Sequence, residues 1–172
     1  LHTLASAYRK SGGDAPRLLV HDTGFGREII SLAARHGRGL PADVIPLDVP
    51  ALSSFGHAEI LAALASGFSD VTLLLAPTTE RDALEQEIPL AQAMSGDSKV
   101  ALLDVADPDA LCDALYGGKD APEPCEAPIL PMGSRRQVTR LSAKALHQSD
   151  AALPLPDSAP YGAVLVNTDA CT

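Results

Sequence analysis

The chain lacks the cysteine and apolar patterns that mark several protein classes. It has three cysteines, Cys112, Cys125 and Cys171, and their wide spacing fits neither a disulfide framework nor a closed zinc site. So few cysteines favour a reducing compartment, and we expect a cytoplasmic protein. No apolar run approaches the roughly 18 residues that a membrane-spanning helix needs. No basic segment followed by an apolar one opens the chain.

Recognisable catalytic motifs are also missing from the sequence. It contains no GxSxG elbow and no cysteine with a histidine partner evident from the sequence, so nucleophilic catalysis has no support. His21, Asp22 and His57 would share one edge of the predicted sheet, but no metal-ligand spacing links them. We therefore expect no catalytic residue in this chain.

The net charge of −9 is concentrated in one stretch. Residues 80–126 hold twelve acidic and three basic side chains, so the remainder of the chain is neutral. This predicts a solvated acidic face and argues against nucleic acid as a partner. The one basic cluster comes later, at Arg136, Arg140 and Lys144. These residues share one stripe of a helix that Ser134 opens with a capping box.

Hydrophobic periodicity alternates between strand and helix. Apolar runs predict strands at residues 18–21, 44–47, 71–76 and 99–105, and a weaker fifth strand at 128–130. Helical patterns follow at residues 24–36 and 56–66, and further helices are predicted to begin after Thr79, Asp107 and Ser134. Pro89 should kink or interrupt the helix after Thr79, and Pro108 should be the first residue of the helix after Asp107. Buried strands that alternate with helices form a parallel sheet covered on both faces. The sequence therefore predicts a doubly wound, flavodoxin-like α/β domain with four to five strands.

The predicted domain occupies the middle of the chain. The sequence begins at Leu1, and residues 1–13 are typical of the tail of a preceding helix, so we expect an excised domain. The α/β domain is predicted for residues 14–147. Residues 148–172 begin with a proline-rich stretch, which is typical of a semi-rigid linker.

A glycine-containing loop follows the first predicted strand, where ligands of such sheets bind. Gly24 and Gly26 stand at a helix N-terminus, which favours anions, and Asp48 ends the second strand where a dinucleotide fold places its ribose acid. The third position of the G-x-G-x-x-G pattern is Ile29, whose bulk should hold the helix away from the strand. We prefer an ordinary βα turn. A nucleotide or anion site formed by Gly24, Gly26 and Asp48 is the alternative.

The end of the sequence carries a possible cluster ligand. The alternating run Gly162–Val166 leads into Asp169–Thr172, which resembles the opening of a bacterial ferredoxin cluster box, C-x2-C-x2-C-x3-C-P. Cys171 would be the first ligand of an iron–sulfur cluster, and the other three would lie beyond Thr172. The alternative is a free cysteine in a frayed tail, and we favour the ligand.

A longer stretch, from Arg17 to about Met94, carries a family resemblance. It includes HDTGFGREIISLAARHGRGLPADVIPLDVP and FGHAEILAALASGFSDVTLLLAP, and it resembles the delta-subunit domain of methyl-viologen-reducing hydrogenases. In bacterial homologues that domain occurs inside polyferredoxin-type iron–sulfur proteins. The family carries cluster cysteines in the loops after the strands. Here those loops read Asp-Thr-Gly, Asp-Val-Pro and Ala-Pro-Thr, so the resemblance implies a scaffold without a cofactor of its own.

These observations lead to one main expectation and two alternatives. We expect a non-catalytic scaffold domain of a 4Fe–4S, ferredoxin-type electron-transfer protein, whose clusters lie in adjoining modules that work with redox partner proteins. The first alternative is the nucleotide or anion site described above. The second is an interaction scaffold whose acidic face or basic helix docks a redox partner.

Overall fold

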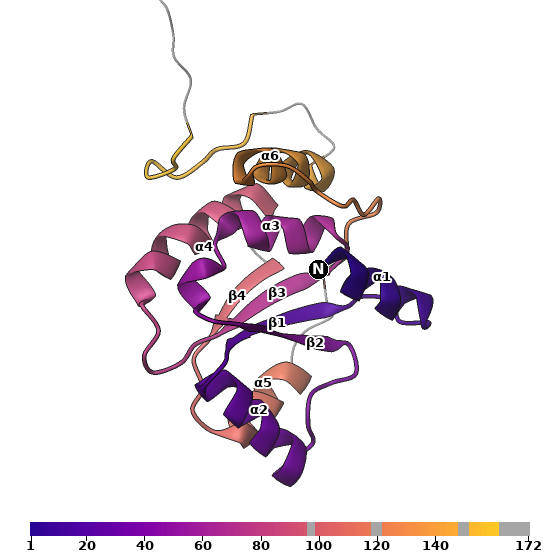
Figure 1. Ribbon diagram of the computed structural model, residues 1–172, viewed down its shortest axis with the longest axis vertical. Coiled ribbons are helices and arrows are strands. Elements are labelled where there is room, and N and C mark those ends of the chain that lie inside the picture. The colour runs from indigo at the N-terminus through magenta and orange to yellow at the C-terminus, as the bar shows by residue number, and fades with distance from the viewer. Residues whose placement is uncertain (96–98, 118–121, 148–151, 162–172) are drawn as a thin grey trace, which may run out of the picture.

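Four parallel strands form the centre of the molecule in the computed structural model (Figure 1). The structure describes residues 1–95, 99–117, 122–147 and 152–161. The strands are β1 (Arg17–Asp22), β2 (Val44–Val49), β3 (Asp70–Leu74) and β4 (Val100–Leu103), in the spatial order β2-β1-β3-β4. Arg17 at the start of β1 pairs with Val44 on one side and Asp70 on the other.

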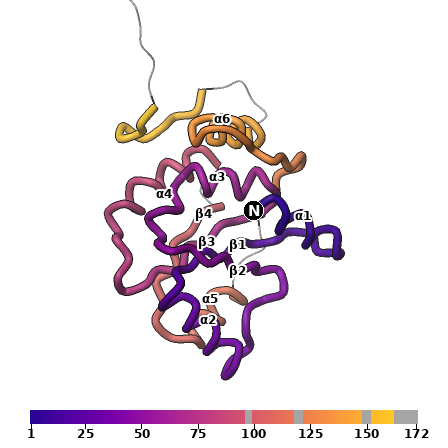
Figure 2. The backbone as a smooth tube through the Cα atoms, in the orientation of Figure 1, coloured from indigo at the N-terminus to yellow at the C-terminus, as the bar shows by residue number. Residues whose placement is uncertain are grey.

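Helices cover both faces of the sheet, and one helix forms an extra layer (Figures 1 and 2). One face carries α2 (Phe25–His36) and α5 (Pro108–Tyr116). The other face carries α3 (His57–Ala65) and α4 (Arg81–Ser95), together with the short 3-10 helix η1 (Leu52–Ser54) and α1 (His2–Lys10). The helix α6 (Arg135–Leu146) packs on the outer side of α3 and α4. This is the doubly wound α/β fold that the sequence predicts.

The side chains of β1 show how the sheet separates two cores. Leu18 and Val20 point to the side of α3 and α4, whereas Leu19 points to the side of α2 and α5. All three are at most 1% exposed. Alternation along a strand sends successive side chains to opposite faces, so a strand buried on both faces must be apolar throughout. Burial of each such side chain contributes about 1.5–3 kcal/mol, and β1 is one of the two interior strands of the sheet.

Helix caps read from the sequence are confirmed. The Asp107 carboxylate accepts a hydrogen bond from the backbone nitrogen of Ala110 at 3.0 Å, and Pro108 is the first residue of α5. Ser134 and Gln137 form the predicted capping box at the start of α6. These local signals succeed because a cap involves residues only a few positions apart.

Three local predictions need correction. Residues 128–130 form no strand; the backbone nitrogen of Ile129 instead donates to the carbonyl of Ala65, the last residue of α3. Thr79 does not cap α4, because its hydroxyl accepts from the backbone nitrogen of Ala76 in the preceding turn. The helix α4 runs through Pro89 without interruption. Pro89 is exposed, so water can hydrate the carbonyl group that the proline leaves unpaired.

Residues 152–161, the described part of the predicted linker, pack against the domain. We call them the strap. Leu155, Ala159 and Tyr161 contact a small apolar cluster of Leu61, Leu90 and Met94 from α3 and α4.

The predicted helix at the start of the chain is α1, whose Ala5 is fully buried in the larger core. No helix within the described ranges has the length and apolar character to cross a membrane.

Candidate functional site

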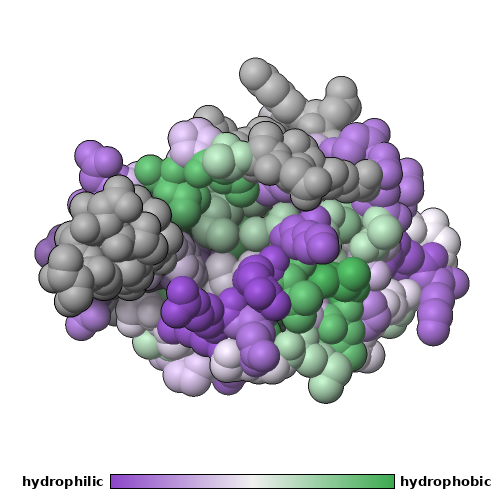
Figure 3. Space-filling model, turned by 90° about the horizontal axis from the view of Figure 1, so that it is seen from above, coloured by the Kyte–Doolittle hydropathy of each residue, from purple (hydrophilic) through white to green (hydrophobic). Residues whose placement is uncertain are grey.

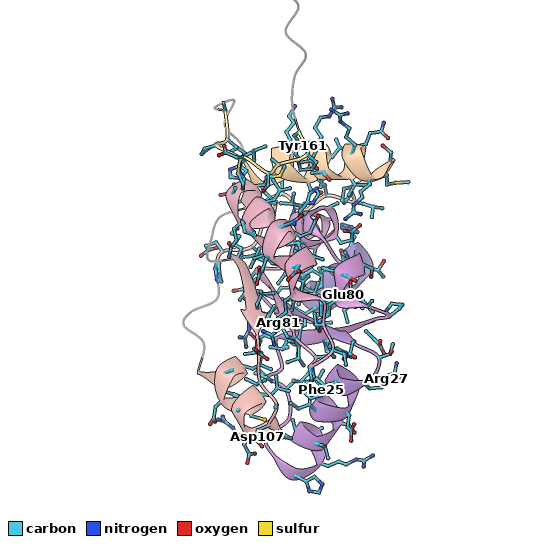
Figure 4. All side chains as sticks on the ribbon, turned by 90° about the vertical axis from the view of Figure 1, so that its left-hand side faces the viewer. Phe25, Arg27, Glu80, Arg81, Asp107 and Tyr161 are labelled. Carbon is cyan, nitrogen blue, oxygen red and sulfur yellow. The ribbon has the colours of Figure 1, made fainter. Side chains whose placement is uncertain are left out.

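The carboxyl ends of the strands form one edge of the sheet, and Figure 4 looks onto it. β2 is added on one side of β1, and the chain then crosses to add β3 and β4 on the other side. The direction in which strands are added to the sheet therefore reverses between β1 and β3. Ligands of open α/β sheets bind at this reversal. Phe25 and Arg27 lie here at the start of α2, and Glu80 and Arg81 lie at the start of α4.

A small polar cleft of about 210 Å³ lies at this reversal. Its walls come from the loops after three strands and include Asp22, Ser53, Thr78 and Glu80. Two carboxylates and several hydroxyls make the lining rich in hydrogen-bond acceptors. Such a lining repels an anion such as phosphate. The cleft is also smaller than the roughly 300 Å³ at which ligand pockets commonly begin.

The glycine loop is occupied by the chain itself. The Asp22 Oδ1 atom accepts a hydrogen bond from the backbone nitrogen of Gly26 at 2.5 Å, so a carboxylate already lies at the N-terminus of α2. A Cβ atom on Gly26 would come within 2.6 Å of the Cβ of His21. Gly26 is therefore the residue that lets α2 approach β1. Ile29 does not hold the helix away, because it is buried between α2 and the sheet, in the same cluster as Leu19.

Asp48 lies on the same edge, but it also has a partner within the chain. It faces His21 in the register of β2 and β1, and its Oδ2 atom pairs with the guanidinium of Arg27 on α2. Its Oδ1 atom is buried without a hydrogen-bond partner in the described part of the chain. The structure thus brings Gly24, Gly26 and Asp48 to one edge. A nucleotide would have to displace both Asp22 and Arg27 there.

A second polar cluster, His57 with Glu87 and Tyr161, lies at the start of α3. The His57 ring places Nδ1 2.5 Å from Glu87 Oε2 and Nε2 2.6 Å from the Tyr161 hydroxyl. The backbone nitrogen of His57 also donates to Glu87 Oε2, at 2.7 Å. Burial alone would raise the pKa of the Glu87 carboxyl, but the hydrogen bonds from His57 outweigh burial and hold that pKa below its usual value.

These contacts assign the proton between His57 and Glu87. An ionised carboxylate only accepts hydrogen bonds, so Nδ1 of His57 donates to Glu87. The Tyr161 hydroxyl, which can both donate and accept, forms the hydrogen bond with Nε2. The His57 ring therefore joins Glu87 on α4 to Tyr161 of the strap. The sequence indicated His57 as an edge residue beside His21 and Asp22, but it gave no signal for its partners. Glu87 and Tyr161 lie 30 and 104 positions away.

The described cysteines are packing residues. Cys112 is 3% exposed in the core beneath α5, and Cys125 is buried beside α6. Their Sγ atoms lie 3.6 Å from the carbonyl oxygens of Gly39 and Ala145, respectively. Residues of the described ranges form no group of three or more metal-ligating side chains around one point. Cys171 and the run Gly162–Val166 lie outside the described residues.

One perturbed carboxyl lies at the opposite, amino edge of the sheet. Burial raises the pKa of Asp70 to about 6, and the neighbouring guanidinium of Arg17 offsets only part of that rise. Arg17 is shared, because it also forms an ion pair with Asp43 at 2.6 Å and donates to the carbonyl of Leu115. The cluster ties β1 to the end of α5, so its role is structural.

The strand order and the covered faces define an open, doubly wound α/β domain of the flavodoxin-like type. Comparison with known proteins adds no narrower class. No family model matches the chain, and no curated protein matches it.

Proposed function

We propose that this chain is a non-catalytic scaffold domain of a cytoplasmic, ferredoxin-type 4Fe–4S protein that takes part in electron transfer. In this proposal the cluster ligands lie mostly in modules that follow the domain, and Cys171 is the first of them. The observation that carries the proposal is the anchoring of the strap, which fixes the position of Tyr161 on the domain.

The strap is held by two kinds of contact. Its apolar residues lie on the cluster formed by α3 and α4, and the Tyr161 hydroxyl is bonded to the buried ring of His57. Cys171 follows Tyr161 by ten residues. Ten residues span at most about 35 Å when fully extended, so a cluster bound by Cys171 would stay close to this surface. Holding an electron-transfer centre within a short reach is a scaffold role.

The carboxyl edge of the sheet supports the same role. The polar groups expected to bind a ligand there are bonded within the chain: Asp22 with the Gly26 nitrogen and Asp48 with Arg27. An edge closed by its own ion pairs and hydrogen bonds is suited to stability. Together with strand-end loops that lack the cysteines of the resembled hydrogenase subunits, this favours a scaffold over a cofactor-binding domain.

Anaerobic reconstitution with iron and sulfide tests the proposal. The 172-residue chain should bind no stoichiometric iron, because one candidate thiolate cannot hold a four-iron cluster. The protein translated from the complete gene should bind iron and show the visible absorbance of 4Fe–4S clusters. Cys171→Ser should reduce its iron content, and the matched control Cys125→Ser should not. A full-length protein without iron, or a 172-residue chain with stoichiometric iron, would reject the proposal.

The position of the polar cleft at the strand reversal favours one other candidate, a nucleotide- or anion-binding domain. Thermal unfolding with NAD, NADP, FMN and ATP separates the two. A ligand at 100 times its dissociation constant stabilises a protein by about 2.7 kcal/mol, which is readily measured. We expect no shift with any of the four. A saturable rise that Asp48→Asn alters would favour the alternative.

A further inference from the structure

The helix α6 carries cations that have no carboxylate partner in the described part of the chain. Four arginines form ion pairs with carboxylates: Arg17 with Asp43, Arg27 with Asp48, Arg81 with Asp104, and Arg135, the first residue of α6, with Glu59. Arg136, Arg140 and Lys144 are exposed, and no such ion pair is found for them among the described residues. In a chain of net charge −9, three cations in a row on one helix are available to an acidic partner.

Two hollows lie between α6 and the strap, and we call them together the α6 groove. One has a volume of about 260 Å³, with a floor formed by Met94, Ala143 and Leu155. The other has a volume of about 270 Å³ and reaches His57 and Pro160. The hollows share Arg136, Thr139 and Tyr161, so they lie next to each other along the helix.

The groove combines an apolar floor with a cationic rim. Met94, Ala143 and Leu155 supply the apolar surface of the first hollow, while Arg136 and Arg140 belong to the same lining. On the side of the molecule that carries α6, the surface shows hydrophilic residues directly beside hydrophobic ones (Figure 3). An apolar side chain would be desolvated on the floor, and guanidinium groups form bidentate hydrogen bonds with carboxylates. A purely polyanionic ligand would leave the floor unused.

We propose that the α6 groove is a docking surface for an acidic protein segment that carries an apolar side chain. Lys144 extends the cationic rim beyond the two hollows, and the spacing of this rim sets the pattern of that segment. Arg136 and Lys144 are eight residues apart on the helix, or about 12 Å at 1.5 Å per residue. An extended segment covers 12 Å in about four residues. Carboxylates on both sides of one or two apolar residues would therefore match the rim and the floor. This inference does not depend on the proposed iron–sulfur module.

Fluorescence anisotropy with a labelled peptide of sequence SEDLFEDS tests the surface on the 172-residue chain. We expect saturable binding at low salt that weakens at physiological salt, because the Debye length falls from about 30 Å at 0.01 M to about 8 Å at 0.15 M. The matched peptide SEDAAEDS keeps the charges and lacks the large apolar side chains. It should bind at least about tenfold more weakly if the floor takes part, since each apolar side chain buried contributes about 1.5–3 kcal/mol.

Variants of the protein locate the binding site. Arg136→Glu combined with Arg140→Glu should weaken binding of the first peptide about tenfold or more, because it places like charges against the carboxylates. The control pair Lys10→Glu and Arg35→Glu makes the same charge change at exposed positions on α1 and α2 and should leave binding nearly unchanged. Ala143→Phe, which fills the first hollow, should reduce binding without a change of charge. Unfolding curves of each variant establish that the fold is retained.

Four results would overturn the proposal. The first is equal binding by the two peptides, and the second is equal loss of binding in the reversal variant and its control. The third is self-association in sedimentation experiments that the Arg136 and Arg140 reversal abolishes, because a second copy would then be the occupant. The fourth is a gain in peptide affinity on truncation after Tyr161, because the residues that follow Tyr161 would then fill the groove.

Discussion

Replacing Tyr161 with phenylalanine tests whether the strap is anchored as the structure shows. The substitution removes one hydroxyl and leaves Nε2 of His57, a residue only 7% exposed, without its partner at 2.6 Å. An unsatisfied buried polar group costs about 1–3 kcal/mol. Partial hydration at the end of the strap should place the loss near the lower half of that range. In a domain of this size, each 1 kcal/mol lowers the melting temperature by about 2–4 °C.

A double-mutant cycle isolates the contact from other effects of the substitution. Tyr161→Phe and His57→Gln are measured singly and together by urea unfolding followed by circular dichroism. The coupling energy should be about 0.5–1.5 kcal/mol, the net contribution of a typical hydrogen bond. Tyr116→Phe is the control, because the Tyr116 hydroxyl makes only a long contact of 3.4 Å with the carbonyl of Arg38 and the residue is 37% exposed. It should change stability by less than about 0.5 kcal/mol.

Two outcomes of these unfolding measurements would refute the anchoring of the strap by His57. If Tyr161→Phe costs no more than Tyr116→Phe, or if the coupling energy is zero, His57 does not anchor the strap in solution. The proposed scaffold role would then lose the observation on which it rests. The docking surface on α6 would also lose one wall of its groove, because Tyr161 borders both hollows.

Three further predictions concern the sheet and its edges. In thermal unfolding, Gly26→Ala should destabilise the fold by about 1–3 kcal/mol, because the new Cβ would lie 2.6 Å from the Cβ of His21. Gly24→Ala is the control and should destabilise it less, because the atom nearest to its Cβ would be Asp22 Oδ2 at 3.3 Å. Asp70→Asn should stabilise the protein at pH 7.5 by about 1–3 kcal/mol. The pKa of the Asp70 carboxyl is about 6 in the folded state and near 3.8 in the unfolded state. The contribution of this carboxyl to stability is therefore fully present below pH 3.8 and is lost as the pH rises through about 6. The gain should vanish near pH 4, and a gain that is independent of pH would contradict the assigned cause. Asp107→Ala should cost about 1 kcal/mol through loss of the α5 cap, measured by urea unfolding, and no loss would show that the cap is dispensable.

The sequence predicted the layers of the fold because the signals for them are local. The apolar runs at β1 and β3 and the caps at Asp107 and Ser134 each depend on residues within a few positions of one another. The strand prediction was wrong at residues 128–130, a short apolar segment that could contact either the sheet or a helix. Residues 128–130 have the composition of a strand, but Ile129 bonds to the C-terminal end of α3 and not to a strand of the sheet.

The candidate site shows the same division. The sequence predicted correctly that Gly24, Gly26 and Asp48 meet at one edge, because parallel strands bring their following loops together. It gave no indication that Asp22 would occupy the helix N-terminus or that Arg27 would pair with Asp48. Those pairings depend on side-chain directions that the hydropathy pattern does not contain.

The sequence alone determined an α/β domain, the succession of strands and helices along the chain up to the last predicted strand, and the row of cations on α6. Periodicity and short-range hydrogen bonding decide these features, and both are encoded in neighbouring residues. Only the tertiary structure decided that the proline-rich strap lies on α3 and α4, that His57 bonds to Glu87 and Tyr161, and that an apolar groove borders Arg136 and Arg140. These contacts join residues far apart in the chain, and their formation depends on how the helices pack on the sheet.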